Sequence, residues 1–130
     1  MNERALRHLL EDFGRALDRL GEALAVPEDA PLAVDGTIQR FEFTFELFWK
    51  ALRRRLAGDG IEANSPKLVL QQAYRRGWLD DEQRWLLLLQ DRNLSSHAYH
   101  EPLALEIYRR LPAHHAAMRQ AFDRLAGESS

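Results

Sequence analysis

The sequence predicts an all-α protein, an antiparallel up-and-down bundle of about five helices. Apolar residues recur at three- and four-residue spacing over almost the whole chain, and no segment alternates apolar and polar side chains as a strand would. Proline and glycine interrupt this pattern at 27–31, at 58–60, at Gly77 and before Pro102. Helices joined by such short connections pack as antiparallel neighbours, which favours a bundle.

The composition limits the size, the location and the partners of the protein. The chain has 130 residues, no cysteine, 18 basic and 20 acidic side chains, and a net charge of -2. We expect a single domain over residues 1–130, with an ordered core at about 4–126. The lack of cysteine excludes disulfides and thiolate metal sites and fits a cytoplasmic protein. No apolar run is long enough to span a membrane, and the net charge argues against a general nucleic-acid-binding protein.

The first expected helix covers residues 6–24 and ends near Val26 and Pro27. Its apolar residues share one face of the helix, which should point into the core. They are Leu6, Leu9, Leu10, Phe13, Leu17, Leu20 and Leu24.

The second expected helix carries apolar residues from Ile38 to Leu56 and stops at Gly58. Phe43 and Leu47 lie on its opposite side, so the helix has two apolar faces. Two apolar faces indicate either a central position in the bundle or a core contact plus a contact with a second chain, which we expect for Phe43. A salt-bridged flank is expected between the faces, formed by Glu42, Glu46, Lys50 and Arg53.

Two shorter helices should follow. Ser65 is expected to cap the third helix, which ends at Gly77, and Asp80 with Gln83 resembles a capping box for the fourth. Five consecutive apolar residues at 85–89 cover the whole circumference of that fourth helix. We therefore expect it to be buried on all sides, either within the chain or at a dimer seam.

The fifth expected helix begins at Glu101 and continues to about Leu125. Pro112 should kink or interrupt it, because proline lacks the N–H that the helix needs. His114 and His115 point about 100° apart on a helix, so they cannot share a metal ion as an i,i+4 pair would. We expect both histidines at the surface.

The polar segment 91–100 follows the apolar fourth helix and invites a functional interpretation. On one straight helix, Arg92 and His97 would point about 140° apart, so they could not both reach one atom. Either the helix unwinds within Ser95 and Ser96, or a second copy of the chain completes a site. The structural alternative is a helix C-terminus, where Arg and His interact with the last carbonyls.

Residues 38–50, rich in Phe and Glu, and the segment 91–99 with its Arg-x4-His-x-Tyr pattern closely resemble the nucleotidyltransferase substrate-binding protein family. These small helical proteins belong to the HEPN superfamily and are encoded beside a minimal nucleotidyltransferase. The resemblance extends from about Leu6 to Leu125, and the Arg-x4-His-x-Tyr pattern is present without departure.

The resemblance implies a homodimer that forms through the central helices and has the motif at its seam. Relatives with this motif act as metal-independent endoribonucleases without a cofactor, and as toxins. The adjacent nucleotidyltransferase neutralises them by transferring AMP to the motif tyrosine. Arg92 and His97 would be the catalytic pair acting on RNA, and Tyr99 the modified residue. Hydrogen bonds to phosphate or sugar are expected from Asn93, Ser95 and Ser96.

Two other functions stay open at this point. Older descriptions of the family make it a non-catalytic subunit that presents substrate to the nucleotidyltransferase. A plain dimeric scaffold is the third function considered, although it does not explain the polar motif. Arg53, Arg54 and Arg55 with Arg75 and Arg76 could guide RNA to the seam, but such runs more often form solvated faces or complement helix ends.

Overall fold

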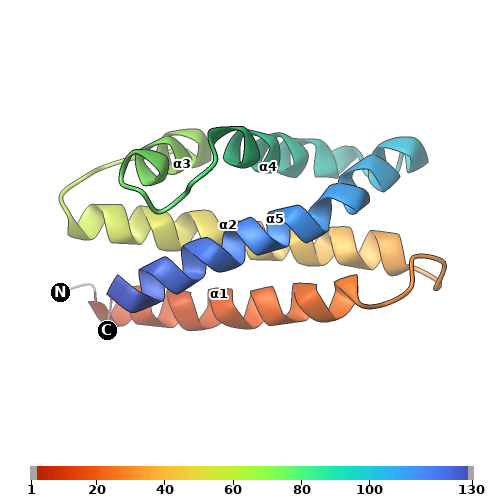
Figure 1. Cartoon of the computed structure of the whole chain (residues 1–130), viewed down its shortest axis with the longest axis horizontal. Helices are drawn as coiled ribbons and strands as arrows, with labels where there is room; N and C mark the ends of the chain where they lie inside the picture. Colours follow the sequence, from red (N-terminus) through yellow and green to blue (C-terminus); the bar gives the residue numbers. More distant parts are fainter. Residues whose placement is uncertain (1–2, 129–130) are drawn as a thin grey trace.

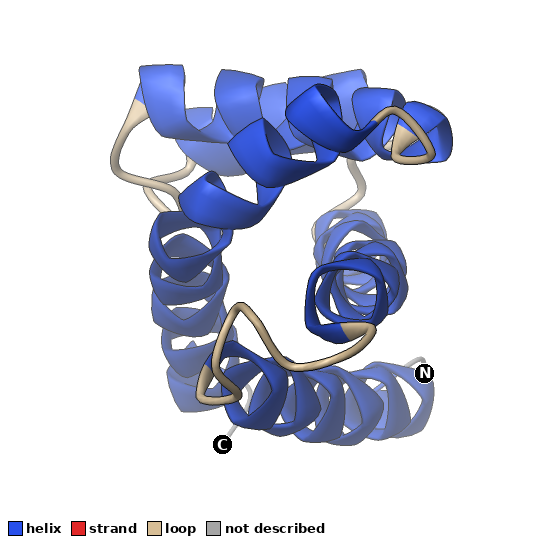
Figure 2. Cartoon of the chain, turned by 90° about the vertical axis from the view of Figure 1, so that its right-hand side faces the viewer, coloured by secondary structure: helices blue, strands red, loops and turns tan. Residues whose placement is uncertain are grey.

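Five α-helices and one short 3-10 helix form the regular structure of residues 3–128, the part of the chain that this computed structural model describes (Figure 1). In chain order they are α1 (Glu3–Leu24), α2 (Ala33–Gly58), α3 (Pro66–Arg75), α4 (Glu82–Leu94), the 3-10 helix η1 (Ser95–His97) and α5 (Glu101–Glu128). Within 3–128 the chain contains only helices and loops (Figure 2). The all-α prediction is confirmed.

Helices α1, α2 and α5 pack against one another, and α3 and α4 lie outside this group. α1 and α2 run in opposite directions side by side, and α5 packs across both (Figure 1). α3 and α4 lie end to end along the other side of α2. The start of α1 and the end of α5 meet at one end of the bundle, whereas the turn between α4 and α5 lies at the opposite end. This turn carries the polar motif.

The core is built from the apolar stripes predicted for the first two helices. Phe13 of α1 is fully buried and contacts Phe48 of α2 and Phe122 of α5, with ring centroids 5.7 and 5.6 Å apart. Each buried aromatic side chain of this kind contributes roughly 2–3 kcal/mol of transfer free energy. The bundle is therefore held by one apolar core, to which α3 and α4 also contribute buried side chains.

Helix α2 contacts the other four helices, so it is the central helix of the fold. Its second apolar face is nevertheless only partly covered: Leu47 is half-buried, and 54% of Phe43 is exposed. The neighbours of α2 within the chain therefore leave Phe43 open to solvent.

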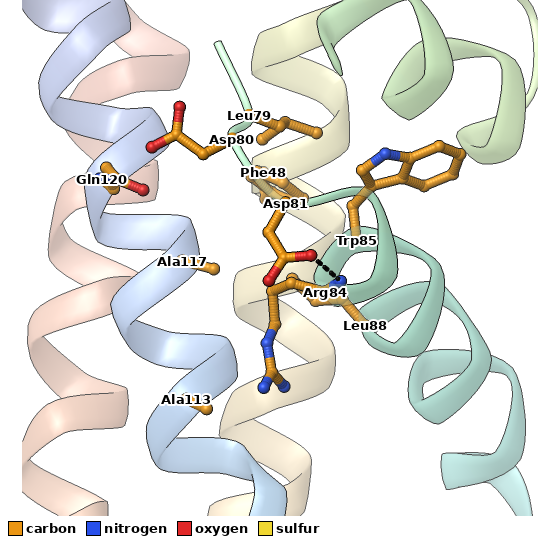
Figure 3. A pocket seen from close by; sticks show the side chains of 10 residues that line it. All are labelled: Phe48, Leu79, Asp80, Asp81, Arg84, Trp85, Leu88, Ala113, Ala117 and Gln120. Carbon is orange, nitrogen blue, oxygen red and sulfur yellow. Dashed lines mark hydrogen bonds between the residues drawn. The ribbon is translucent and has the colours of Figure 1, made fainter. Parts of the chain in front are cut away.

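The helix caps follow the sequence at α3 but not at α4. Ser65 caps α3, because its Oγ accepts a hydrogen bond from the backbone N–H of Leu68 at 3.3 Å. The capping residue of α4 is Asp81, whose carboxylate accepts from the N–H of Arg84 at 3.2 Å (Figure 3). The predicted Asp80 capping box is wrong by one residue, since Asp80 turns toward α5 and forms an ion pair with Arg124 at 2.8 Å.

Within one protomer residues 85–89 are not buried on all sides, and their burial at a dimer seam stays a prediction. Trp85 and Leu88 are buried, Leu87 and Leu89 are half-buried, and 43% of Leu86 is exposed. The physical reason is the position of α4 outside the group formed by α1, α2 and α5, which leaves one of its sides without a neighbour within the described chain.

Pro112 does not interrupt α5, which runs from Glu101 to Glu128. The proline side chain is exposed, while Leu111 and Met118 on the other side of the helix are fully buried. Packing of this apolar side keeps the helix together across the missing N–H. No helix in the described residues is long and apolar enough to cross a membrane.

Candidate active site at the end of helix α4

The polar motif sits where the α-helical backbone changes to a tighter turn. α4 ends at Leu94, η1 occupies Ser95–His97, and α5 begins at Glu101 after a short turn. Of the two arrangements considered from the sequence, the helix does unwind at Ser95. Because the winding changes at Ser95, Arg92 before this point and His97 after it have different surroundings.

Arg92 points from the last turn of α4 toward α2. About a third of its side chain is exposed, and its Nη1 lies 3.8 Å from Oε2 of Glu42 and 3.4 Å from Oγ of Ser95. Its Nε is buried and has no hydrogen-bond partner. Arg92 is thus held by an ion pair, and one of its donors, the buried Nε–H, has no partner.

Ser95 is the buried member of the motif. Its hydroxyl lies 2.6 Å from Oε2 of Glu42 and 2.7 Å from the carbonyl oxygen of Arg92, and its single proton can be donated to one of them at a time. In this protomer the Ser95 hydroxyl thus bonds within the protein, and the substrate contact expected for it stays a prediction.

The salt-bridged flank predicted on α2 is only partly present. Glu46 pairs with Lys50 at 3.6 Å, and the guanidinium of Arg53 lies over the ring of Trp49. Glu42 leaves this flank and faces the motif instead.

His97 and Tyr99 project into solvent beyond the turn. Nδ1 of His97 lies 3.4 Å from the hydroxyl of Tyr99, and 83% of Tyr99 is exposed. No hydrogen bond or ion pair joins Arg92 to His97 within this protomer. Asn93 and Ser96 are also exposed, with the Ser96 hydroxyl donating to the Asn93 carbonyl at 3.3 Å.

A shallow groove of about 480 Å³ separates the motif from the first half of α2. Glu42 and Ser95 form one part of its lining, and Tyr99 stands at its edge. The rest of the lining is contributed by Leu32, Asp35, Gly36, Ile38, Gln39 and Ala98. The exposed Tyr99, the buried Ser95 and the half-buried Glu42 therefore line one groove.

The chain that carries this motif is similar to known proteins. Residues 8–127 match the family described as "Nucleotidyltransferase substrate binding protein like". The chain belongs to this family. The match includes the whole motif and both segments that carried the resemblance, so the family predicted from the sequence is confirmed.

One curated protein is similar to this chain in sequence, and a solved structure is similar in both sequence and fold. It is 34% identical over 80 residues to a protein named "Probable ribonuclease HepT" from Haemophilus influenzae, a match that spans 58% of this chain and 55% of that relative. The chain thus covers about half the length of this curated relative. A crystal structure from Thermus thermophilus shares 43% identity at a TM-score of 0.81, covering 87% of this chain and 98% of that one.

A second solved structure shows the same fold at lower identity. This Haemophilus influenzae protein is described as having the fold of a substrate-binding domain of a nucleotidyltransferase. It is 23% identical, with a TM-score of 0.68, and the match covers 96% of this chain and 99% of that one.

Sequence reasoning missed a buried polar cluster behind the motif in this family member. The Asp91 carboxylate, fully buried, accepts two hydrogen bonds from Arg110 and one from Nε2 of His114, each at 2.7 Å. Burial raises the pKa of Asp91, but the hydrogen bonds from Arg110 and His114 outweigh it and hold the pKa below its usual value of 3.8. The same hydrogen bond to Asp91 raises the pKa of Arg110.

The surface position predicted for the two histidines of α5 is wrong. His114 is fully buried, and His115 is half-buried with Nε2 2.9 Å from the carbonyl oxygen of Leu17. The sequence did contain a signal for His114, because Ile107, Leu111 and Met118 are buried at helical spacing around it. A polar residue on an apolar stripe has to find a buried partner, and here Asp91 provides it.

A smaller cavity of about 190 Å³ lies at the other end of α4 (Figure 3). Asp81 and Arg84 lie on one side of it and Ala113, Ala117 and Gln120 of α5 on the other, with Phe48, Leu79, Asp80, Trp85 and Leu88 completing the lining. Arg84 also extends toward the buried cluster, and its Nη1 lies 3.2 Å from Nδ1 of His114. Among residues 3–128 no group of three or more His, Cys, Asp or Glu side chains is placed to hold a metal ion.

The arginine runs considered as RNA guides have structural partners in part. Arg55 and Arg76 both lie 5.3 Å from the ring of Trp78 and both pair with Asp59, at 2.7 and 2.5 Å. The hydrogen bond from Arg55 is the largest cause of a lowered pKa at Asp59. This arrangement ties the end of α2 to the end of α3, so Arg55 and Arg76 complement helix ends, one of the two interpretations given above.

Proposed function

We propose that this protein is the toxin of a toxin–antitoxin pair: a cytoplasmic, metal-independent endoribonuclease that acts as a homodimer. In this proposal a cognate minimal nucleotidyltransferase neutralises it by adding AMP to Tyr99. One observation carries the proposal. The imidazole of His97 and the hydroxyl of Tyr99 are 3.4 Å apart and exposed, at a turn where about a third of the Arg92 side chain is also exposed.

The chemistry of RNA cleavage matches these residue types. The 2′-oxygen attacks the neighbouring phosphorus, the bond to the 5′-oxygen breaks, and a 2′,3′-cyclic phosphate is formed. A base removes the 2′-hydroxyl proton, an acid gives a proton to the leaving oxygen, and a cation stabilises the charged phosphorane. An imidazole such as that of His97 can act as base or acid, and Arg92 can hold the phosphate through two N–H donors.

A second copy of the chain solves the separation of Arg92 and His97. Across a two-fold axis, each residue of one protomer can approach the other residue of its partner, and two copies of His97 can divide the roles of acid and base. Phe43 of α2 and Leu86 of α4 support this dimer, because they are exposed apolar side chains on the two helices next to the motif.

Adenylylation of Tyr99 would stop the reaction by charge and by bulk. The phenol oxygen attacks the α-phosphorus of ATP, the bond to pyrophosphate breaks, and the phenol proton passes to a base or to water. The product carries a negatively charged phosphate beside His97, which repels the RNA backbone. The 83% exposure of Tyr99 supports its access to a second enzyme.

The central experiment is RNA cleavage by the purified chain in the presence of EDTA, with growth of expressing cells as a parallel measurement. We expect His97→Ala and Arg92→Ala to abolish both cleavage and growth arrest. His100→Ala is the matched control, because His100 is an exposed histidine just outside the motif, and it should behave as the wild type. Cleavage that survives His97→Ala would refute the ribonuclease assignment.

Co-expression with the neighbouring nucleotidyltransferase tests the second half of the proposal. Growth should recover, and the intact mass should increase by one AMP group, localised to Tyr99. Tyr99→Phe keeps the ring but lacks the oxygen, so it should remain toxic in the presence of the partner. Relief of toxicity in Tyr99→Phe would show that neutralisation does not use this residue.

A non-catalytic substrate-binding subunit is the second candidate. It is supported by the description of the family and by the groove of about 480 Å³ that Tyr99 borders. This function predicts no growth arrest and no RNA cleavage by the chain alone, together with nucleotidyltransferase activity that increases when the chain is added. The cleavage and growth measurements above therefore separate the two candidates.

A further inference from the structure

A buried polar cluster joins the last turn of α4 to α5 directly behind the motif. It consists of the buried Asp91 and His114 with the half-buried Arg110 and Arg84, and is called the Asp91 joint below. We propose that the Asp91 joint is a positioning device: it fixes the rotation of the last turn of α4, and so sets the direction in which Arg92 points. The catalytic part of this inference rests on the proposed ribonuclease function, whereas its geometric part does not.

The joint is built from directional contacts that reach three helices. Asp91 of α4 accepts three hydrogen bonds of 2.7 Å from two residues of α5, Arg110 and His114. The His114 ring stacks on Phe41 of α2, with centroids 5.7 Å apart and planes 21° apart. The bidentate pair with Arg110 allows only a narrow range of orientations of the Asp91 carboxylate.

The contacts also define which nitrogen of His114 carries the proton. A guanidinium can only donate hydrogen bonds, so the 3.2 Å contact from Arg84 requires Nδ1 of His114 to be an acceptor. The proton of a neutral ring is then on Nε2, which donates to Asp91. His114 therefore bridges the two groups: its Nδ1 accepts from Arg84 and its Nε2 donates to Asp91.

The energetics favour a role in geometry rather than in stability. Burying the Asp91 carboxylate costs desolvation energy, although Arg110 stays about a third exposed, and apolar residues of similar volume usually give equal or greater stability than a buried charged group and its partners. An apolar contact between α4 and α5 would hold the helices together but would allow α4 to rotate about its axis. The Asp91 joint prevents that rotation because its hydrogen bonds are directional.

The rotation of α4 matters because Arg92 follows Asp91 directly. Consecutive side chains on a helix point about 100° apart, so locking Asp91 against α5 turns Arg92 toward α2. There its guanidinium reaches Glu42, and Ser95, one turn later, donates to the same carboxylate at 2.6 Å. The backbone leaves the α-helical path at Ser95, so these contacts fix the base from which His97 projects.

Two substitutions of His114 provide the sharpest test. His114→Gln keeps a donor for Asp91 and an acceptor for Arg84, whereas His114→Phe keeps an aromatic ring for the stack on Phe41 but has neither. We expect His114→Phe to lower kcat for RNA cleavage by about tenfold or more with KM changed by less than about twofold, and His114→Gln to recover most of kcat. Asp91→Asn should resemble His114→Phe.

Asp80→Asn is the matched control, because it removes an ion pair between the loop before α4 and helix α5. Asp80 pairs with Arg124 of α5 at 2.8 Å, but it lies at the opposite end of α4 from the motif. Its loss should leave kcat and KM unchanged. All rates are compared per folded molecule, with the folded fraction of each variant determined by circular dichroism at the assay temperature.

A second measurement is independent of catalysis. The buried Nε–H of Arg92 should give a resolved nitrogen–proton NMR signal in the wild type, since its proton is protected from water. This signal should shift or broaden in Asp91→Asn and His114→Phe, and remain in place in His114→Gln and Asp80→Asn. If Asp91→Asn does not fold, the two His114 variants alone decide the question.

The outcomes separate the two levels of the proposal. Wild-type protein that cleaves no RNA refutes the proposed function, and the Arg92 signal still tests the geometry. If His114→Phe loses stability but keeps both the Arg92 signal and the kcat per folded molecule, the Asp91 joint is merely structural and the inference is wrong.

Discussion

Replacing Ser95 by Ala tests whether this motif residue holds the fold or binds a substrate. The Ser95 hydroxyl is buried and lies 2.6 Å from the Glu42 carboxylate. A hydrogen bond to a charged group contributes about 1.5–3 kcal/mol, and its loss also leaves the carboxylate short of a donor. We therefore expect Ser95→Ala to lower the free energy of unfolding by about 2 kcal/mol.

Ser96→Ala is the matched control, since Ser96 is exposed and its hydroxyl reaches only the Asn93 carbonyl, at 3.3 Å. An exposed substitution of this kind should change stability by less than about 0.5 kcal/mol.

Urea unfolding followed by circular dichroism measures the difference between the two variants. With a slope near 2 kcal/mol per molar urea, the midpoint of Ser95→Ala should fall by about 1 M relative to wild type, while that of Ser96→Ala stays within about 0.3 M. Equal midpoints for the two variants would refute the reasoning. A stable Ser95→Ala protein with a raised KM for RNA would instead restore the substrate contact that the sequence predicted.

Three further predictions concern stability. Because the pKa of Asp91 is lowered, its ionised form stabilises the fold at pH values above the unfolded pKa of 3.8, and this contribution is lost as the pH falls through the folded pKa. Urea midpoints measured from about pH 5 to pH 2 should therefore fall less steeply in Asp91→Asn than in wild type. Gly77 has a φ of +80°, so Gly77→Ala should lower the free energy of unfolding by roughly 1 kcal/mol. Gly36→Ala lies inside α2, where an added Cβ meets nothing within 4 Å, and should raise the free energy of unfolding by roughly 0.5–1 kcal/mol. Equal urea midpoints for the two variants would contradict this. Phe13→Ala removes a fully buried ring and should cost about 3–5 kcal/mol in thermal or urea unfolding, compared with less than about 0.5 kcal/mol for Val26→Ala at a half-exposed loop position.

The helices could be predicted because their signals are local. The apolar stripe of α1 and the Ser65 cap of α3 depend only on residues three or four positions apart. The cap at Asp81 was missed because neighbouring aspartates carry equivalent side chains, and only the backbone conformation decides which one faces the helix N–H groups. The interruption considered at Pro112 was wrong because the local cost of proline is visible in the sequence, whereas the packing that offsets it is not.

The candidate site divides in the same way. Arg92, His97 and Tyr99 stand close together in the sequence, so their pattern and its family could be recognised from the order of residues alone. Glu42 was placed on the wrong partners because its contact with Ser95 spans 53 positions of the chain. His114 was placed at the surface because its partner Asp91 lies 23 positions away, on another helix.

The sequence by itself therefore determined that this chain is helical, which residues form most of its core, and which family it belongs to. The tertiary structure decided which members of the motif are exposed and which are held by the protein, and it placed a buried ion pair behind them. The physical reason is that helix periodicity and family patterns act over a few residues, whereas the partner of a buried polar group is chosen by packing between helices. Ser95 and Ser96 make the difference plain: they are identical and adjacent in the sequence, yet one is buried against Glu42 and the other faces solvent.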